Sequence, residues 1–124
     1  MIEQVKKLNS SAEYYFHEGC FITEYSNDEN DDQCSIAKAR LEPEKVTKWH
    51  SLTATTERYV VISGVGLVEV GSLPAERVSS GDVVIIPPGI RQRIASIGDE
   101  DLIFLAICTP RFLANNYVDL EAGS

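Results

Sequence analysis

The chain has 124 residues, of which 44% are hydrophobic, and a formal net charge of -8 at pH 7. This length predicts a single domain over residues 1–124. The charge disfavours nucleic acids and anionic membranes as partners, because their phosphates would be repelled. No apolar run is long enough for a transmembrane helix, and the polar N-terminus lacks a signal-peptide core, so we expect a cytoplasmic protein.

Short runs of β-branched and aromatic residues, separated by glycine, proline and acidic turns, predict β-strands through most of the chain. The polar residues 1–13 precede these runs and are expected to form a short N-terminal arm. Strands are predicted at about 20–25, 35–41, 46–52, 57–62, 67–70, 83–86, 91–97 and 102–108. The last strand is almost wholly apolar, so we expect it to be buried on both faces. Residues 111–120 carry large apolar side chains and should pack back across the barrel, with a helical turn.

The regular spacing of turns, every 8–12 residues, is typical of a β-sandwich or barrel, and no long amphipathic helix is evident. We therefore predict an all-β jelly-roll barrel with its core at about residues 20–108. Three cysteines, Cys20, Cys34 and Cys108, have no CxxC spacing. They are expected to be free thiols rather than ligands of a zinc site or parts of a disulfide framework.

Three polar residues on different predicted strands, His50, Glu57 and Gln92, can point into one interior. Because alternate side chains of a strand share a face, Leu52 accompanies His50 and Tyr59 accompanies Glu57, so both are expected to line the pocket. An imidazole, a carboxylate and an amide oxygen together are able to hold a divalent cation.

A metal-free interior explains the same residues. In that interpretation His50 hydrogen-bonds Glu57 or Gln92, because a buried carboxylate without a partner is costly. His50 and Glu57 would then form a general acid/base pair and be the catalytic residues. The sequence leaves both interpretations open, and it also leaves open whether Lys38 and Arg40 face the pocket or solvent.

The spacing of residues 50–64 resembles the first motif of the cupin superfamily. That motif is His-x-His, three or four residues, Glu, six residues and Gly. This chain has His50-Ser51-Leu52, then four residues, Glu57, then six residues and Gly64.

Residues 81–96 resemble the second cupin motif, which is Gly, five residues, Pro-x-Gly, two residues, His, three residues and Asn. This chain has Gly81, five residues, Pro87-Pro88-Gly89, two residues, Gln92, three residues and Ser96. The resemblance extends from about residue 35 to residue 108, and it is greatest to small single-domain cupins.

The resemblance implies a double-stranded β-helix with a metal held by three histidines and one glutamate. Of these ligands only His50 and Glu57 are present, and Leu52 and Gln92 occupy two histidine positions. A divalent-metal site built from His50, Glu57 and Gln92 would therefore favour a harder ion or be less selective among ions.

Two functions follow from the resemblance. One is an enzyme of the isomerase, lyase or dioxygenase kind that acts on a small polar metabolite inside the barrel. The other is a metal-free, non-catalytic module that binds or senses a small ligand. The resemblance also implies a homodimer, which we expect to form by pairing of sheet edges through a strand near residues 14–25.

Overall fold

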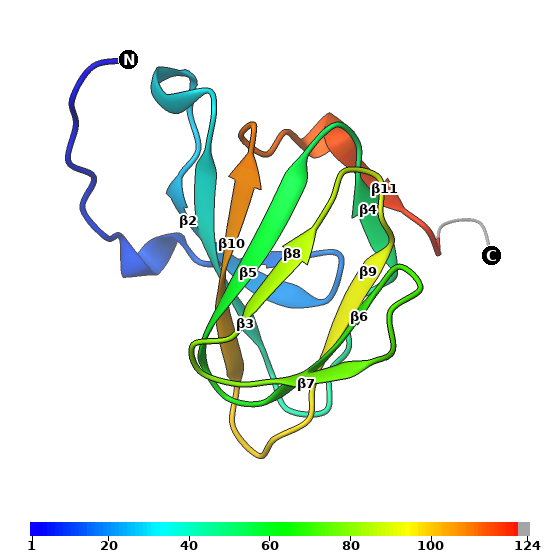
Figure 1. The fold of residues 1–124 in the computed structure, drawn as a ribbon. Helices are drawn as coiled ribbons and strands as arrows, with labels where there is room; N and C mark the ends of the chain where they lie inside the picture. Colours follow the sequence, from blue (N-terminus) through cyan, green and yellow to red (C-terminus); the bar gives the residue numbers. More distant parts are fainter. Residues whose placement is uncertain (122–124) are drawn as a thin grey trace.

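The computed structural model describes residues 1–121 as two antiparallel sheets that face each other (Figure 1). The six-stranded sheet has the order β1-β2-β3-β10-β5-β8, with β1 Tyr14–Phe16, β2 Cys20–Ser26, β3 Ser35–Leu41, β10 Leu102–Thr109, β5 Thr56–Ser63 and β8 Val83–Ile86. The five-stranded sheet has the order β11-β4-β9-β6-β7, with β11 Tyr117–Asp119, β4 His50–Leu52, β9 Gln92–Ser96, β6 Gly66–Val70 and β7 Glu76–Val78.

The predicted all-β jelly roll is confirmed. The helical segments among residues 1–121 are short 3-10 turns at Ser10–Ala12, Glu29–Asp31 and Ala114–Asn116. No helix in that range is long and apolar enough to span a bilayer. The blue N-terminal arm in Figure 1 runs outside the barrel, as expected for its polar composition.

Two strand predictions differ from the structure. The strand expected over 46–52 forms only at His50–Leu52, because Lys48 gives its main-chain N–H to the carbonyl oxygen of Glu18 instead of to a sheet neighbour. The strand expected near residues 14–25 is divided in two, because Tyr14–Phe16 pairs with β2 of the same chain across a tight turn. Gly19 permits that turn with a φ of +117°.

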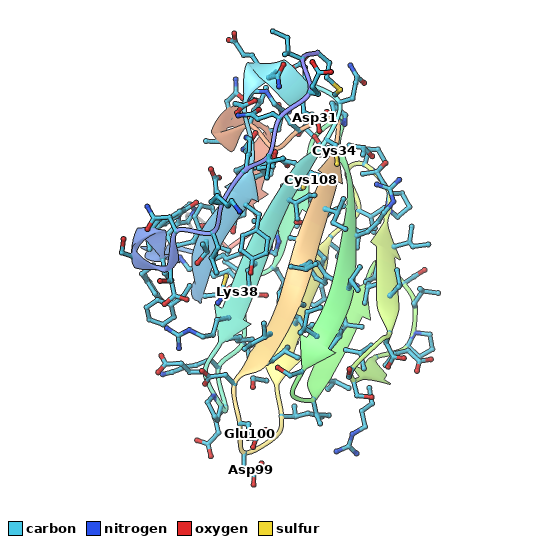
Figure 2. The ribbon with its side chains drawn as sticks, turned by 90° about the vertical axis from the view of Figure 1, so that its left-hand side faces the viewer. Asp31, Cys34, Lys38, Asp99, Glu100 and Cys108 are labelled. Atoms are coloured by element: carbon cyan, nitrogen blue, oxygen red, sulfur yellow. The ribbon has the colours of Figure 1, made fainter. Side chains whose placement is uncertain are left out.

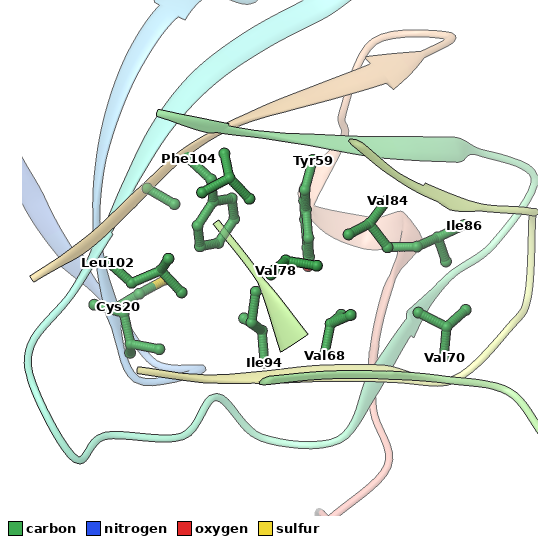
Figure 3. Close-up of a cluster of buried hydrophobic side chains, with 13 residues drawn as sticks. Cys20, Tyr59, Val68, Val70, Val78, Val84, Ile86, Ile94, Leu102 and Phe104 are labelled. Atoms are coloured by element: carbon green, nitrogen blue, oxygen red, sulfur yellow. The ribbon is translucent and has the colours of Figure 1, made fainter. Parts of the chain in front are cut away.

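The core lies between the two sheets and follows the alternation of each strand. In Figure 3, Tyr59 and Phe104 of the six-stranded sheet point toward Val68 and Ile94 of the five-stranded sheet. Leu41, Ile94 and Leu102 are fully buried. Each such side chain contributes about 1.5–3 kcal/mol to folding through apolar burial.

Strand β10 lies between β3 and β5, but it is not buried on both faces as predicted. Its inner residues Leu102, Phe104 and Cys108 are buried, whereas Ile103, Leu105 and Ile107 are only partly covered. These three residues lie on the outer face, where the described chain places no third layer. The apolar run therefore reflects one buried face and one partly exposed face.

The outer face of the six-stranded sheet carries Lys38 and Arg40, which answers the question that the sequence left open. Figure 2 shows Lys38 from this side. Arg40 packs over the ring of Phe21 at 4.3 Å and forms ion pairs of 2.8 Å with Glu13 and 3.2 Å with Asp101. Neither cation lines the interior cavity described below.

The segment after β10 returns across the barrel as predicted. It passes through the 3-10 turn Ala114–Asn116 and adds β11 to the edge of the five-stranded sheet (Figure 1). In this pairing Tyr117 lies opposite Leu52 and Asp119 lies opposite His50. The C-terminal segment therefore covers the strand that carries the candidate histidine.

The turn between β5 and β6 gives a test of the packing. Gly64 has a φ of +83°, and an added Cβ would lie 2.4 Å from the carbonyl oxygen of Asp101. We predict that Gly64→Ala lowers the free energy of unfolding by about 2–5 kcal/mol, through backbone strain and overpacking.

Gly81→Ala is the matched control, because Gly81 has a φ of +92° but nothing within 4 Å of an added Cβ. It should cost only the backbone term, about 1–2 kcal/mol. Urea unfolding measures both variants, and equal losses would contradict the close approach at Gly64.

Candidate functional site

A cavity of about 60 Å³ opens between the sheets beside the β1–β2 turn. It exists partly because two alanines, Ala37 of β3 and Ala106 of β10, lie opposite each other in register on its wall. The volume has room for about four water molecules. The remaining walls are mainly aromatic and aliphatic, with His50 and the carboxyls of Glu18, Glu24 and Glu57 among them.

His50 is 3% exposed and is held by the main chain. Its Nδ1 lies 2.7 Å from the carbonyl oxygen of Lys48. Because a carbonyl only accepts, Nδ1 carries the proton, and Nε2 of the neutral ring bears a lone pair. Burial lowers the pKa of His50, against the opposing effect of the Lys48 hydrogen bond. The ring of Tyr117 stacks on the imidazole at a centroid distance of 5.1 Å.

Glu18 is a site residue that the sequence analysis missed. Its Oε2 lies 3.1 Å from Nε2 of His50, without the alignment of a hydrogen bond. The β1–β2 turn places it there, since the carbonyl oxygen of Glu18 accepts the N–H of Lys48 at 2.8 Å. Thus the main chain of Lys48 holds both partners. No motif marks Glu18, and the only local signal is the glycine that follows it in the turn.

Burial of Glu18 changes its protonation. The side chain is 14% exposed. Burial, and then the charge of Glu57, raise the pKa of Glu18 to about 8, although the thiol of Cys20 donates to its Oε1 at 3.3 Å. At neutral pH the Glu18 carboxyl is therefore mostly protonated and faces a neutral imidazole.

Glu57 lines the cavity as predicted and is 9% exposed. It lies opposite Cys108 in register, and the Cys108 thiol donates to its Oε2 at 3.7 Å, while Oε1 has no hydrogen-bond partner. Burial raises the pKa of Glu57 to about 7. The polar side chains of Gln92, Cys108 and Tyr59 oppose this rise.

Gln92 is fully buried and lies opposite His50 in the β4–β9 register, but it does not line the cavity. Its Oε1 accepts a hydrogen bond from the hydroxyl of Tyr59, and its Nε2 has no partner. Leu52 and Tyr59 both line the cavity. The structure thus brings His50 and Glu57 to the cavity and places Gln92 behind them.

The interpretation in which His50 hydrogen-bonds Glu57 or Gln92 needs a correction. Within residues 1–121, the groups at the two ring nitrogens are the Lys48 carbonyl and the Glu18 carboxyl. Gln92 bonds Tyr59 instead, because Tyr59 shares the inner face of β5 and projects across the cavity toward β9.

The donor set does not fit the metal that the cupin resemblance implies. Leu52 offers no donor atom, and the Gln92 oxygen that would coordinate a cation is occupied by Tyr59. In the described chain no three His, Cys, Asp or Glu side chains are grouped so as to hold a metal ion. Structural and catalytic zinc sites use at least three protein ligands.

The raised carboxyl pKa values predict a pH-dependent stability. Glu18 and Glu57 ordinarily titrate at 4.5, but they do so at about 8 and about 7 in the folded protein. Their contribution is complete below pH 4.5 and is lost as pH rises through the folded pKa values. The free energy of unfolding should therefore fall between pH 5 and 8, by up to about 1.4 kcal/mol per pH unit for each carboxyl.

Glu18→Gln should flatten this slope, because glutamine mimics the protonated acid. The control is Glu13→Gln, since Arg40 lowers the pKa of Glu13 and its effect is constant above pH 5. Urea unfolding at a series of pH values measures both variants. A wild-type stability that rises from pH 5 to 8 would contradict the burial of neutral carboxyls.

Comparison with known proteins identifies the fold independently. The sequence model described as "Cupin domain" matches residues 37–108. No curated protein matches the sequence. An uncharacterized conserved protein with a double-stranded β-helix domain from Klebsiella pneumoniae superposes with a TM-score of 0.75 at 15% identity, covering 93% of this chain and 96% of that one.

Two enzymes share the fold. The nucleoside dehydratase Pac13 superposes with a TM-score of 0.73 at 17% identity, over 92% of this chain and 89% of that one. The oxalate decarboxylase of Lactobacillus farciminis superposes with a TM-score of 0.73 at 22% identity, over 87% of this chain but only 33% of that one. At these identities the likeness shows the fold alone. With the family match over more than half of its residues, the chain belongs to the cupin family.

Proposed function

We propose that this cupin binds a small polar metabolite in its barrel and catalyses proton transfer to and from it. His50 is the base and a buried carboxyl is the acid. The observation that carries the proposal is the contact of 3.1 Å between Nε2 of His50 and Oε2 of Glu18 at the wall of the cavity. Catalytic acids and bases exchange protons over hydrogen-bond distances of this size.

His50 suits the role of base because its proton is fixed on Nδ1. The Lys48 carbonyl holds that proton, so the lone pair of Nε2 faces the carboxyl side of the cavity. When Nε2 takes a proton, the ring becomes positive beside Glu18, and an ionised Glu18 carboxylate stabilises that charge.

Glu57 suits the role of acid. It is buried, and its pKa is raised to about 7, so that it is available in both protonation states near neutral pH. A base that removes one proton and an acid that returns another are the requirements of isomerisation and of elimination. These reactions are the isomerase and lyase classes within the proposed function.

Deuterium uptake tests the proposal without a known substrate. A mixture of neutral, cationic and anionic metabolites is incubated with the protein in deuterium oxide and followed by mass spectrometry. We expect one component to gain deuterium or to be converted. His50→Gln should slow this reaction by about 100- to 10,000-fold, the usual contribution of an acid/base group.

Matched variants of β10 locate the reaction in the cavity. Ala106→Phe fills the cavity wall and should abolish the reaction, whereas Ile107→Phe adds bulk on the outer face and should preserve it. If a metabolite binds but neither gains deuterium nor is converted, the alternative function applies, namely a non-catalytic cupin that binds or senses a small ligand. Exchange that survives in His50→Gln would exclude His50 as the base.

A divalent metal on His50, Glu57 and Gln92 is the second candidate. It is favoured by one observation, since Oε1 of Glu57 is buried in the cavity wall without a partner. From the donor set we expect elemental analysis of untagged protein to find no stoichiometric metal. A stoichiometric divalent metal that disappears in His50→Ala would establish the metal site and overturn this expectation.

The homodimer stays a prediction.

A further inference from the structure

The cavity combines carboxyl groups with aromatic rings, and this combination indicates the charge of its ligand. We propose that the cavity selects a small organic cation, such as a primary alkylammonium, over neutral and anionic molecules of the same shape. This inference rests on the proposed ligand-binding function and goes beyond it, because it names the chemical class of the ligand.

The first support is the sign of the charges around the cavity. Three carboxyls line it, those of Glu18, Glu24 and Glu57, and no lysine or arginine among residues 1–121 does. Nearby arginines have partners elsewhere. Arg40 is paired with Glu13, and Arg58 donates to the hydroxyl of Thr109 at 2.8 Å. At pH 7.5, above the pKa of Glu57, an anionic ligand would therefore be repelled by the Glu57 carboxylate without a compensating cation.

The second support is a set of buried oxygen atoms that lack hydrogen bonds. These are Oε1 of Glu57, Oε2 of Glu18 and the hydroxyl oxygen of Tyr117, and all three residues line the cavity. Glu57 is 9% exposed, so water does not readily replace the missing partner. Gln92, the other residue with an unpartnered atom, lies outside the lining. An ammonium group offers three N–H donors and accepts nothing, which complements such a site.

The third support is the aromatic wall. Phe16 and Tyr117 meet edge to face at a centroid distance of 5.2 Å, and Tyr59 packs on Phe104 at 4.5 Å. All four rings line the cavity. The faces of aromatic rings attract cations, most strongly where water is excluded. They also accommodate the methylene groups of an alkyl chain.

The same wall favours an organic cation over a metal ion. A metal ion needs several oxygen, nitrogen or sulfur ligands. Phe16, Phe104 and Leu52 supply none. An alkylammonium keeps its charge at one end and buries its carbons against these side chains. The cavity of about 60 Å³ has room for an ammonium group and a few carbon atoms.

Three probes of one shape test the inference, namely n-propylammonium, 1-propanol and propionate. Each is titrated into the 124-residue chain at pH 7.5 and followed by the amide resonances of cavity residues. We expect n-propylammonium to bind at least about tenfold more tightly than the other two, which is the size of effect expected from one or two desolvated cation–aromatic or ionic contacts.

Glu57→Gln should weaken the binding of n-propylammonium by about tenfold or more, because it removes the carboxylate charge and retains the shape of the side chain. The affinity for 1-propanol should stay within about twofold of the wild-type value. Glu100→Gln is the matched control. Figure 2 shows Glu100 at the turn before β10, at the opposite end of that strand from Cys108. This variant should bind n-propylammonium as the wild type does.

Equal binding of n-propylammonium and 1-propanol would overturn the inference, as would tighter binding of propionate or an unchanged affinity in Glu57→Gln. In these cases the proposed function stands if Ala106→Phe abolishes binding of the preferred probe. If none of the three probes binds, the inference is wrong, and the deuterium-uptake experiment decides the proposed function on its own. Broadening of cavity resonances by micromolar Mn²⁺ would also contradict it, since the preferred cation would then be a metal.

Discussion

Two carboxyl groups, those of Glu18 and Glu57, are buried against a barrel interior that no lysine or arginine of the described chain lines. An ionised carboxylate in such a place is costly, so at neutral pH Glu18 is mostly a neutral acid and Glu57 is divided between its two protonation states. Their raised pKa values, of about 8 and about 7, follow first from that burial. The same condition leaves acceptor atoms without partners and prepares the interior for a ligand that brings donors or positive charge.

The geometry of the site depends on a short piece of main chain outside any strand. Lys48 donates its N–H to Glu18 and accepts the Nδ1 proton of His50, so one peptide segment aligns the acid and the base. This arrangement explains why the strand expected over 46–52 is interrupted before His50. Regular pairing of Lys48 would remove both contacts. The local loss of sheet structure is therefore what positions the site.

Much of the fold was predictable because the alternation of apolar residues and the spacing of turns directly reflect the two sheets. His50 and Glu57 were identified from strand parity and motif spacing, and both line the cavity. Glu18 was missed because it lies in a turn and not in a strand, so the alternation of side chains along a strand does not identify it. The partner of Gln92 was also unpredictable, because Tyr59 reaches it across the barrel from the opposite sheet. Alternation along a strand predicts the face on which a side chain lies, but it does not predict which other side chain it contacts.

The proposed chemistry depends on buried carboxyls whose pKa values are raised and on a histidine whose pKa is lowered. The most direct test is a carbon-13 NMR titration of the side-chain carboxyls in ligand-free protein, with Glu18→Gln and Glu57→Gln used to assign the resonances. Glu18 should titrate near 8 and Glu57 near 7. Titration of both carboxyls near 4.5 would show that they are ionised at neutral pH, and it would contradict the protonation states from which the proposed chemistry was derived.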